Sequence, residues 1–97
     1  MLNQKEKIEF IAGYYEFSLY INDLFIYCIS LDDPIESWGE CKTESDCKNL
    51  AEETVNAILY ELMENNEELK REILQRNKTE VIKVVADTIM EYKIDRE

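Results

Sequence analysis

Only two glycines and one proline occur in this chain of 97 residues, and they leave little material for tight turns. A fold of many short strands needs several such turns, so their scarcity favours long elements joined by few loops. Hydrophobic residues make up 45% of the chain, which is enough for one modest core at this length. The sequence therefore predicts a single helical domain that spans residues 1–97.

The strongest periodic pattern lies in residues 3–31. Hydrophobic side chains recur there at alternating spacings of four and three, which is typical of an amphipathic or coiled-coil-like helix. Most of the remaining circumference is also apolar, and such a helix is either central in a bundle or buried against another chain. The primary prediction is an all-α bundle of about four helices with a long apolar N-terminal helix. Its seam consists of Phe10, Tyr14, Phe17, Ile21, Leu24, Cys28 and Leu31.

A second interpretation fits the same segment. Phe17, Leu19 and Ile21 occupy alternate positions, and residues 22–23, an Asn-Asp pair, suit a two-residue hairpin turn. The alternative prediction is an α+β fold, in which a β-hairpin near residues 14–31 packs on C-terminal helices. The helix is preferred because the heptad spacing continues across the supposed turn, and an isolated two-stranded hairpin is marginal by itself.

Three helices are expected after this first element. The longest covers residues 44–64, with one side apolar at spacings of three and four. Asn65 with Glu68 matches the capping-box pattern and predicts the start of a short third helix. Asn77 with Glu80 repeats that pattern for a final helix. The predicted inner faces of the three helices carry, in chain order, Ala51, Val55, Ile58, Leu62, Leu69, Ile73, Leu74, Ile82, Val85, Ile89 and Tyr92.

Histidine is absent from the chain, which removes the commonest general base and metal ligand. No conventional triad or Cys–His dyad is then available, and phosphate-cradling loops need more glycines than the chain has. A zinc site at Cys28, Cys41 and Cys47 lacks a fourth ligand. Three cysteines make no disulfide framework, although whether Cys41 and Cys47 pair stays open. The sequence predicts no enzyme, no cofactor and no metal.

The apolar stretch at residues 13–31 has roughly the length of a membrane span. Glu16, Asn22 and Asp23 interrupt it, and each charge at mid-bilayer costs about 2.5–3.5 kcal/mol. No signal-peptide pattern precedes it. The chain is therefore predicted to be cytoplasmic, in the host cytoplasm if its source is viral, and to have no membrane partner.

Acidic residues outnumber basic ones by 22 to 11, which gives a formal net charge of −11. A basic patch is the usual footprint of nucleic-acid binding, so direct nucleic-acid binding is not expected. The sequence favours an acidic protein-binding module, an inhibitor or adaptor that occupies a basic surface of a partner protein, including a nucleic-acid-binding one. Its composition, rich in Ile, Glu, Lys and Asn, is common in AT-rich genomes, and a phage or mobile-element counter-defence protein fits.

The first candidate partner-binding face lies on the helix predicted at residues 44–64 and on the junction after it. Helical neighbours three and four positions apart lie about 5–6 Å from each other, which resembles the spacing of successive phosphates. Such a row could imitate a nucleic-acid strand to a basic protein, whereas the plain alternative is a solvated face. Its residues are Glu53, Tyr60, Glu61, Glu64 and Glu68.

Two further candidates lie earlier in the chain. On the predicted first helix, Tyr20 and Tyr27 border Glu16 and Asp23, the composition of a wet interface that selects a basic partner. The alternative places both tyrosines at the margin of the core, with their hydroxyls in water. Trp38 is either a lid on one end of the core or a binding anchor.

A different function class is also open. A helix as apolar as the one predicted at the N-terminus could serve as a dimer seam. The alternative is therefore a self-associating structural or assembly subunit, a homodimer held together by that helix.

Overall fold

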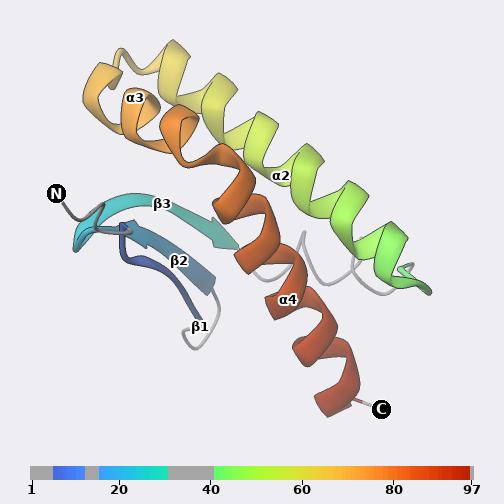
Figure 1. Cartoon of the computed structure of the whole chain (residues 1–97). Coiled ribbons are helices and arrows are strands. Elements are labelled where there is room, and N and C mark those ends of the chain that lie inside the picture. Colours follow the sequence, from blue (N-terminus) through green and yellow to red (C-terminus); the bar gives the residue numbers. More distant parts are fainter. Residues whose placement is uncertain (1–5, 13–15, 31–40, 97) are drawn as a thin grey trace, which may run out of the picture.

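The computed structural model describes residues 6–12, 16–30 and 41–96 and shows an α+β fold (Figure 1). The strands form one antiparallel meander in the order β1-β2-β3. The predicted all-α bundle and its long N-terminal helix are therefore wrong, and the alternative α+β fold fits, with a third strand added to the hairpin. The elements are β1 (Ile8–Ala12), β2 (Glu16–Ile21), β3 (Leu24–Ser30), α2 (Glu44–Glu64), α3 (Glu68–Arg76) and α4 (Lys78–Arg96).

Strand β2 shows why the helical interpretation failed. Phe17, Leu19 and Ile21 are at most 1% exposed, whereas the residues between them are only partly buried, so the operative period is two. A spacing of four, as between Phe17 and Ile21, satisfies both the helical and the strand period. Strand β1 pairs with β2 through its whole length and removes the objection that a two-stranded hairpin is marginal.

The turn between β2 and β3 consists of Asn22 and Asp23, as the alternative interpretation expected. Both have positive φ angles, 52° and 66°, as a two-residue hairpin turn of type I′ requires. Asn22 also fixes the start of β1. Its backbone N–H donates to the Lys7 carbonyl oxygen at 2.7 Å, and its side-chain oxygen accepts from the Lys7 N–H at 2.9 Å.

One face of the sheet packs into the hydrophobic core. Leu19 pairs with Phe10 of β1 and with Tyr27 of β3, and all three side chains share this face. The Phe10 ring stacks on that of Phe17 with 5.1 Å between centroids. The register shifts after Leu19, so Ile26 is an extra residue in β3 and is 1% exposed.

Helices α2 and α4 run side by side in opposite directions, and α4 also contacts β1 (Figure 1). A capping box starts α2, because the Thr43 hydroxyl accepts from the Asp46 N–H and the Asp46 carboxylate accepts from the Thr43 N–H, each at 3.1 Å. The predicted bounds of this helix are confirmed. Its buried residues are Cys47, Ala51, Val55, Ile58 and Leu62.

The final helix begins at Lys78, directly after Asn77, as predicted, whereas the third helix begins at Glu68, later than the predicted cap at Asn65 implies. Asn65 closes α2 instead, since its side chain donates to the Glu61 carbonyl oxygen at 3.0 Å. Asn77 closes α3, where its side chain donates to the Ile73 carbonyl oxygen and to the Glu6 carboxylate. The Glu6 carboxylate also pairs with Arg76 at 2.9 Å. The segment before β1 is thus tied to the junction of α3 and α4.

The inner faces of α3 and α4 were only partly predicted. Leu74 of α3 and Val85 and Ile89 of α4 are fully buried, as expected. Ile82 is only partly buried, and Val81 is buried instead. Leu69 was expected on the inner face of the third helix, but it is 64% exposed. This difference matters for the candidate site.

Candidate protein-binding site

The candidate site lies where α2 ends and α3 begins, and is called the α2–α3 corner. A tight turn fixes it: Asn66 has a positive φ of 57°, and the Glu67 N–H donates to the Leu62 carbonyl oxygen at 3.0 Å. This hydrogen bond places the first turn of α3 next to the last turn of α2. The corner comprises Tyr60, Glu61, Met63, Glu64, Glu68 and Leu69.

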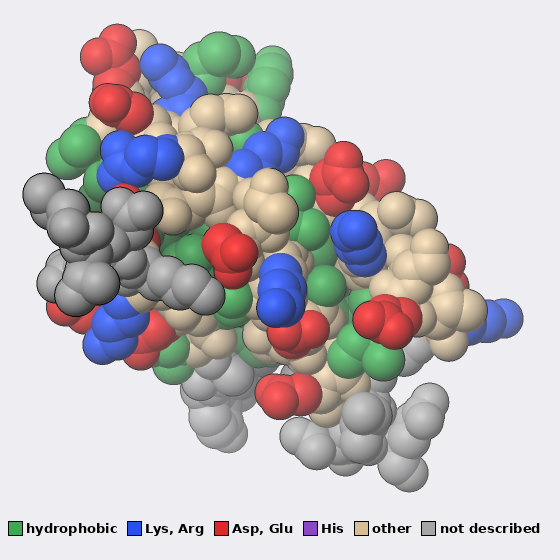
Figure 2. All heavy atoms as spheres, viewed as in Figure 1, with side chains coloured by type: hydrophobic (Ala, Val, Ile, Leu, Met, Phe, Trp, Pro, Cys, Tyr) green, Lys and Arg blue, Asp and Glu red, His purple; other side chains and the backbone are tan. Residues whose placement is uncertain are grey.

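Large hydrophobic side chains are exposed at this corner. Tyr60, Met63 and Leu69 are 59%, 52% and 64% exposed, the three highest values among large hydrophobic residues in the described part of the chain. Tyr60 and Met63 are helical neighbours, about 5–6 Å apart. Figure 2 shows hydrophobic side chains on the surface at the top of the molecule, over the C-terminal part of α2, with basic and acidic side chains beside them. Exposed apolar groups gathered within a polar rim mark an interaction site.

Two carboxylates of the corner stand at an unfavourable end of α2. Glu61 and Glu64 are exposed in its last turn, which contains no basic residue. The C-terminal end of a helix carries partial negative charge, so each acid there costs about 0.3–1 kcal/mol. Within residues 6–12, 16–30 and 41–96, neither forms an ion pair. These two acids therefore lower the stability of α2, and no ion pair in the described residues offsets that cost.

The remaining charges near the corner do not neutralise those two acids. The Lys70 ammonium lies 2.8 Å from the Glu67 carboxylate and 5.3 Å from the centre of the Phe25 ring, so it is already engaged. Glu68 is exposed in the first turn of α3, where the helix dipole favours an acid. The three carboxylates of the corner outnumber Arg71, a basic residue of α3 that lines a pocket with Glu68.

The structure places four residues of the first predicted face, Glu53, Tyr60, Glu61 and Glu64, in exposed positions on α2. Tyr60 lies opposite the buried stripe, whereas Glu61 directly precedes the buried Leu62 and borders that stripe. Glu53 lies seven residues before Tyr60, about 10 Å along the helix axis. Only uncharged residues lie between the two on that face. The acids therefore do not form an evenly spaced row: Glu61, Glu64 and Glu68 cluster at the corner, and Glu53 lies apart from them.

Met63 and Leu69 were missed by the sequence reasoning. Met63 follows Leu62 directly, so it points about 100° away from the buried stripe of α2. That offset was a usable signal. Leu69 offered none, because Leu69 and Ile73 are four positions apart and both fit the inner face of a short helix. Only the packing of α3 shows that Leu69 faces solvent.

The second predicted face is not brought together. Tyr20 and Tyr27 lie on opposite faces of the sheet, because Tyr27 pairs with the inward Leu19 while Tyr20 packs edge-on against Phe25 at 5.7 Å between ring centroids. Burial, and secondarily the charge of Glu61, raise the pKa of Tyr27 above its ordinary value. The register shift after Leu19 separates the two tyrosines, because in an unbroken register Tyr27 would pair with Ser18 and share the face of Tyr20.

The two acids of that face are separated as well. Asp23 lies in the hairpin turn, 3.6 Å from the exposed Lys7 ammonium, a surface pair of little energetic value. Glu16 lies at the start of β2, and the Cys28 thiol donates to its carboxylate at 2.8 Å. This hydrogen bond, with partial burial and the negative charge of Glu16, raises the pKa of Cys28 above its ordinary value. Trp38, the last predicted site residue, lies outside the described residues.

Replacing Glu16 with alanine is expected to speed alkylation of Cys28 at mildly alkaline pH. The change removes the hydrogen bond and the charge that hold the thiol protonated, so the pKa of Cys28 falls and more thiolate is present. The rate can be followed by mass spectrometry of the peptide that contains Cys28, because Cys41 and Cys47 are buried. The difference should close at high pH, where both proteins are fully ionised. An unchanged rate would contradict the contact, and Glu80→Ala serves as the control.

Cys28, Cys41 and Cys47 form no disulfide bond in the described structure. No group of three or more metal-ligating side chains occurs in the part of the chain that the structure describes. Over those residues, none of the helices has the length and apolarity needed to cross a membrane. No protein-family model, curated protein or solved structure matches the chain.

Proposed function

We propose that this protein is an acidic protein-binding module that docks onto a basic surface of a partner protein through the α2–α3 corner. The observation that carries the proposal is the pair Glu61 and Glu64, unpaired in the described structure at the negative end of α2 beside exposed hydrophobic side chains. Residues that oppose a local preference, here the preference for bases at the C-terminal end of a helix, are expected mainly at functional sites when no contact compensates for them. A solvated face needs acids, but it does not need them where they oppose the helix dipole.

The mixture of side chains supports a particular docking mode. Tyr60, Met63 and Leu69 supply apolar area that loses water on contact, which is the source of most binding energy at hot spots. The surrounding carboxylates contribute specificity and association rate, because they attract a basic surface and repel an acidic one. Such binding blocks the covered surface, so the module acts as an inhibitor when that surface binds nucleic acid, and otherwise as an adaptor. The clustering of the acids favours apolar docking with an acidic rim over imitation of a phosphate row.

The proposal does not include catalysis, because the chain has no histidine and few glycines. It places the protein in a reducing cytoplasm, that of the host if the source is viral, and the lack of a disulfide bond between the described cysteines is compatible with this. A homodimer held by an N-terminal helix is not proposed, since that segment forms β2 and β3.

Replacing Glu64 with lysine is expected to stabilise the protein and weaken its binding. The change should raise the free energy of unfolding by about 0.5–1 kcal/mol, because a cation suits the C-terminal end of α2. It should weaken capture of the partner by about tenfold or more, because it sets like charges against each other. Denaturant unfolding measures the first effect. Quantitative mass spectrometry of proteins captured from extracts of the native host measures the second.

Glu80→Lys is the matched control, since it changes the net charge equally and Glu80 lies in the first turn of α4, away from the corner. It should lower stability by up to about 1 kcal/mol and leave capture unchanged. Equal loss of capture from both variants would show that only the overall charge matters. No loss from Glu64→Lys would remove the corner as the binding site.

A further inference from the structure

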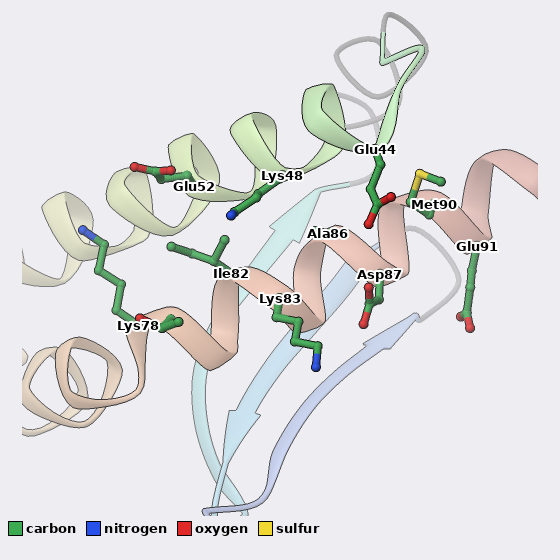
Figure 3. A pocket seen from close by; sticks show the side chains of 11 residues that line it. Glu44, Lys48, Glu52, Lys78, Ile82, Lys83, Ala86, Asp87, Met90 and Glu91 are labelled. Atoms are coloured by element: carbon green, nitrogen blue, oxygen red, sulfur yellow. The ribbon is translucent and has the colours of Figure 1, made fainter.

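A groove runs between α2 and α4, away from the α2–α3 corner (Figure 3). It encloses about 930 Å³. Its floor is apolar and comes from α4, where Ile82, Ala86 and Met90 follow one another at intervals of four residues. Residues four apart stack along one side of a helix, so the floor is a continuous stripe.

This stripe is the second apolar stripe of α4. The first, Val81, Val85 and Ile89, is completely buried in the core. The floor residues are only partly buried against that core. A helix with apolar residues on more than one side belongs inside a bundle or against another chain. The described part of this chain provides no further element over the groove, so α4 retains an apolar side for a partner.

On α4 the charges beside the stripe are divided by sign, whereas α2 adds one charge of each sign to the lining, Lys48 and Glu52. Lys78 and Lys83 lie toward the N-terminal end of α4, whereas Asp87 and Glu91 lie toward its C-terminal end. Figure 3 shows Glu44 of α2 at the same end as Asp87 and Glu91. Within the described ranges, none of these side chains forms an ion pair. Both ends therefore keep their charge available for a partner.

We propose that the groove binds a second copy of this chain, with the two α4 helices antiparallel about a two-fold axis near Ala86. A two-fold axis at the centre of the groove places the basic end of each copy against the acidic end of the other, so the surface is complementary to itself. Lys83 then faces Asp87 or Glu91 of the partner subunit. The small side chain of Ala86 at the axis lets the two helices approach to the usual 8–10 Å or so between axes.

The dimer is independent of the proposed function and compatible with it. Tyr60, Glu61 and Glu64 do not line the groove, so each copy keeps its corner accessible. A dimer would present two corners and could bind a partner with two sites more tightly than one copy does. A contact based on a single helix pair is small, so the association is expected to be weak and concentration-dependent.

Sedimentation equilibrium of charge-reversed variants tests the proposal. The wild-type chain should dimerise in a concentration-dependent manner. The double variant Lys78→Glu/Lys83→Glu makes the α4 side of the groove acidic at both ends, and the double variant Asp87→Lys/Glu91→Lys makes it basic at both ends. Each variant alone should dimerise at least about tenfold more weakly than wild type, because like charges then meet. An equimolar mixture of the two should recover association as a heterodimer.

Each alternative outcome is decisive. A wild-type chain that stays monomeric at the highest soluble concentration would overturn the proposal and leave the groove to a different partner. Undiminished dimerisation of both variants would place the interface elsewhere, as would a mixture that stays monomeric. Glu80→Lys changes a residue outside the groove lining, so this variant should dimerise as wild type does.

Circular dichroism and denaturant unfolding confirm that each variant is folded. A change in partner capture without a change in dimerisation would concern only the proposed function.

Discussion

Replacing Leu19 with alanine is expected to lower the free energy of unfolding by about 3 kcal/mol. Leu19 is fully buried at the centre of β2, the central strand, and pairs with both neighbouring strands. The truncation removes buried apolar carbon and leaves a cavity that surrounding strands and helices can fill only in part. Small domains are stable by about 5–15 kcal/mol, so this loss is a large share of the total. Urea unfolding followed by circular dichroism measures it.

The matched control is Ile11→Ala on β1. Ile11 is 48% exposed and lies on the opposite face of the sheet from the helices. The change should cost no more than about 0.5 kcal/mol, as surface substitutions usually do. Comparable losses from the two variants would contradict the alternation of buried and exposed positions on which the sheet depends.

The N-terminal half of the fold was ambiguous in the sequence for a physical reason. Phe17 and Ile21 are four residues apart, and this spacing suits one turn of a helix as well as two steps of a strand. The two-residue turn then places Leu24 three positions after Ile21, so the heptad spacing continues in the sequence across the turn. Pairing with β1 stabilises the strand conformation of this segment. The local spacing of hydrophobic residues does not reveal that contact. The alternation of Ile8 and Phe10 around Glu9 was the available hint.

The C-terminal half was more predictable, because its pattern is local and long. The stripe from Ala51 to Leu62 repeats over several turns, and a strand cannot satisfy its spacings of three and four. Helix ends were less secure. Asn65 matches an N-cap in sequence but serves as the C-cap of α2, because the same side chain can bond to a free carbonyl oxygen.

The acidic members of the candidate site followed from helical periodicity, whereas its hydrophobic members did not. Once α2 is a helix with a known buried stripe, Glu53, Glu61 and Glu64 must be exposed. Leu69 could not be placed in the same way, since a helix of nine residues fixes its orientation through contacts with other elements. The grouping of Tyr20 with Tyr27 failed together with the helix on which it rested.

Tyr60→Ala tests most directly whether the α2–α3 corner is the binding site. Tyr60 is 59% exposed, so its truncation should barely change the free energy of unfolding, while it removes an aromatic ring from the centre of the proposed contact. Loss of a hot-spot aromatic costs about 2 kcal/mol, which corresponds to roughly 30-fold in affinity.

The measurement is isothermal titration calorimetry with the purified partner that the wild-type chain captures, at low and at high salt. The account predicts a loss of about 30-fold for Tyr60→Ala, no loss for Ile11→Ala, and weaker binding of the wild-type chain at high salt. Unchanged affinity of a folded Tyr60→Ala protein, or an equal loss from Ile11→Ala, would contradict the assignment of the corner as the surface that binds the partner.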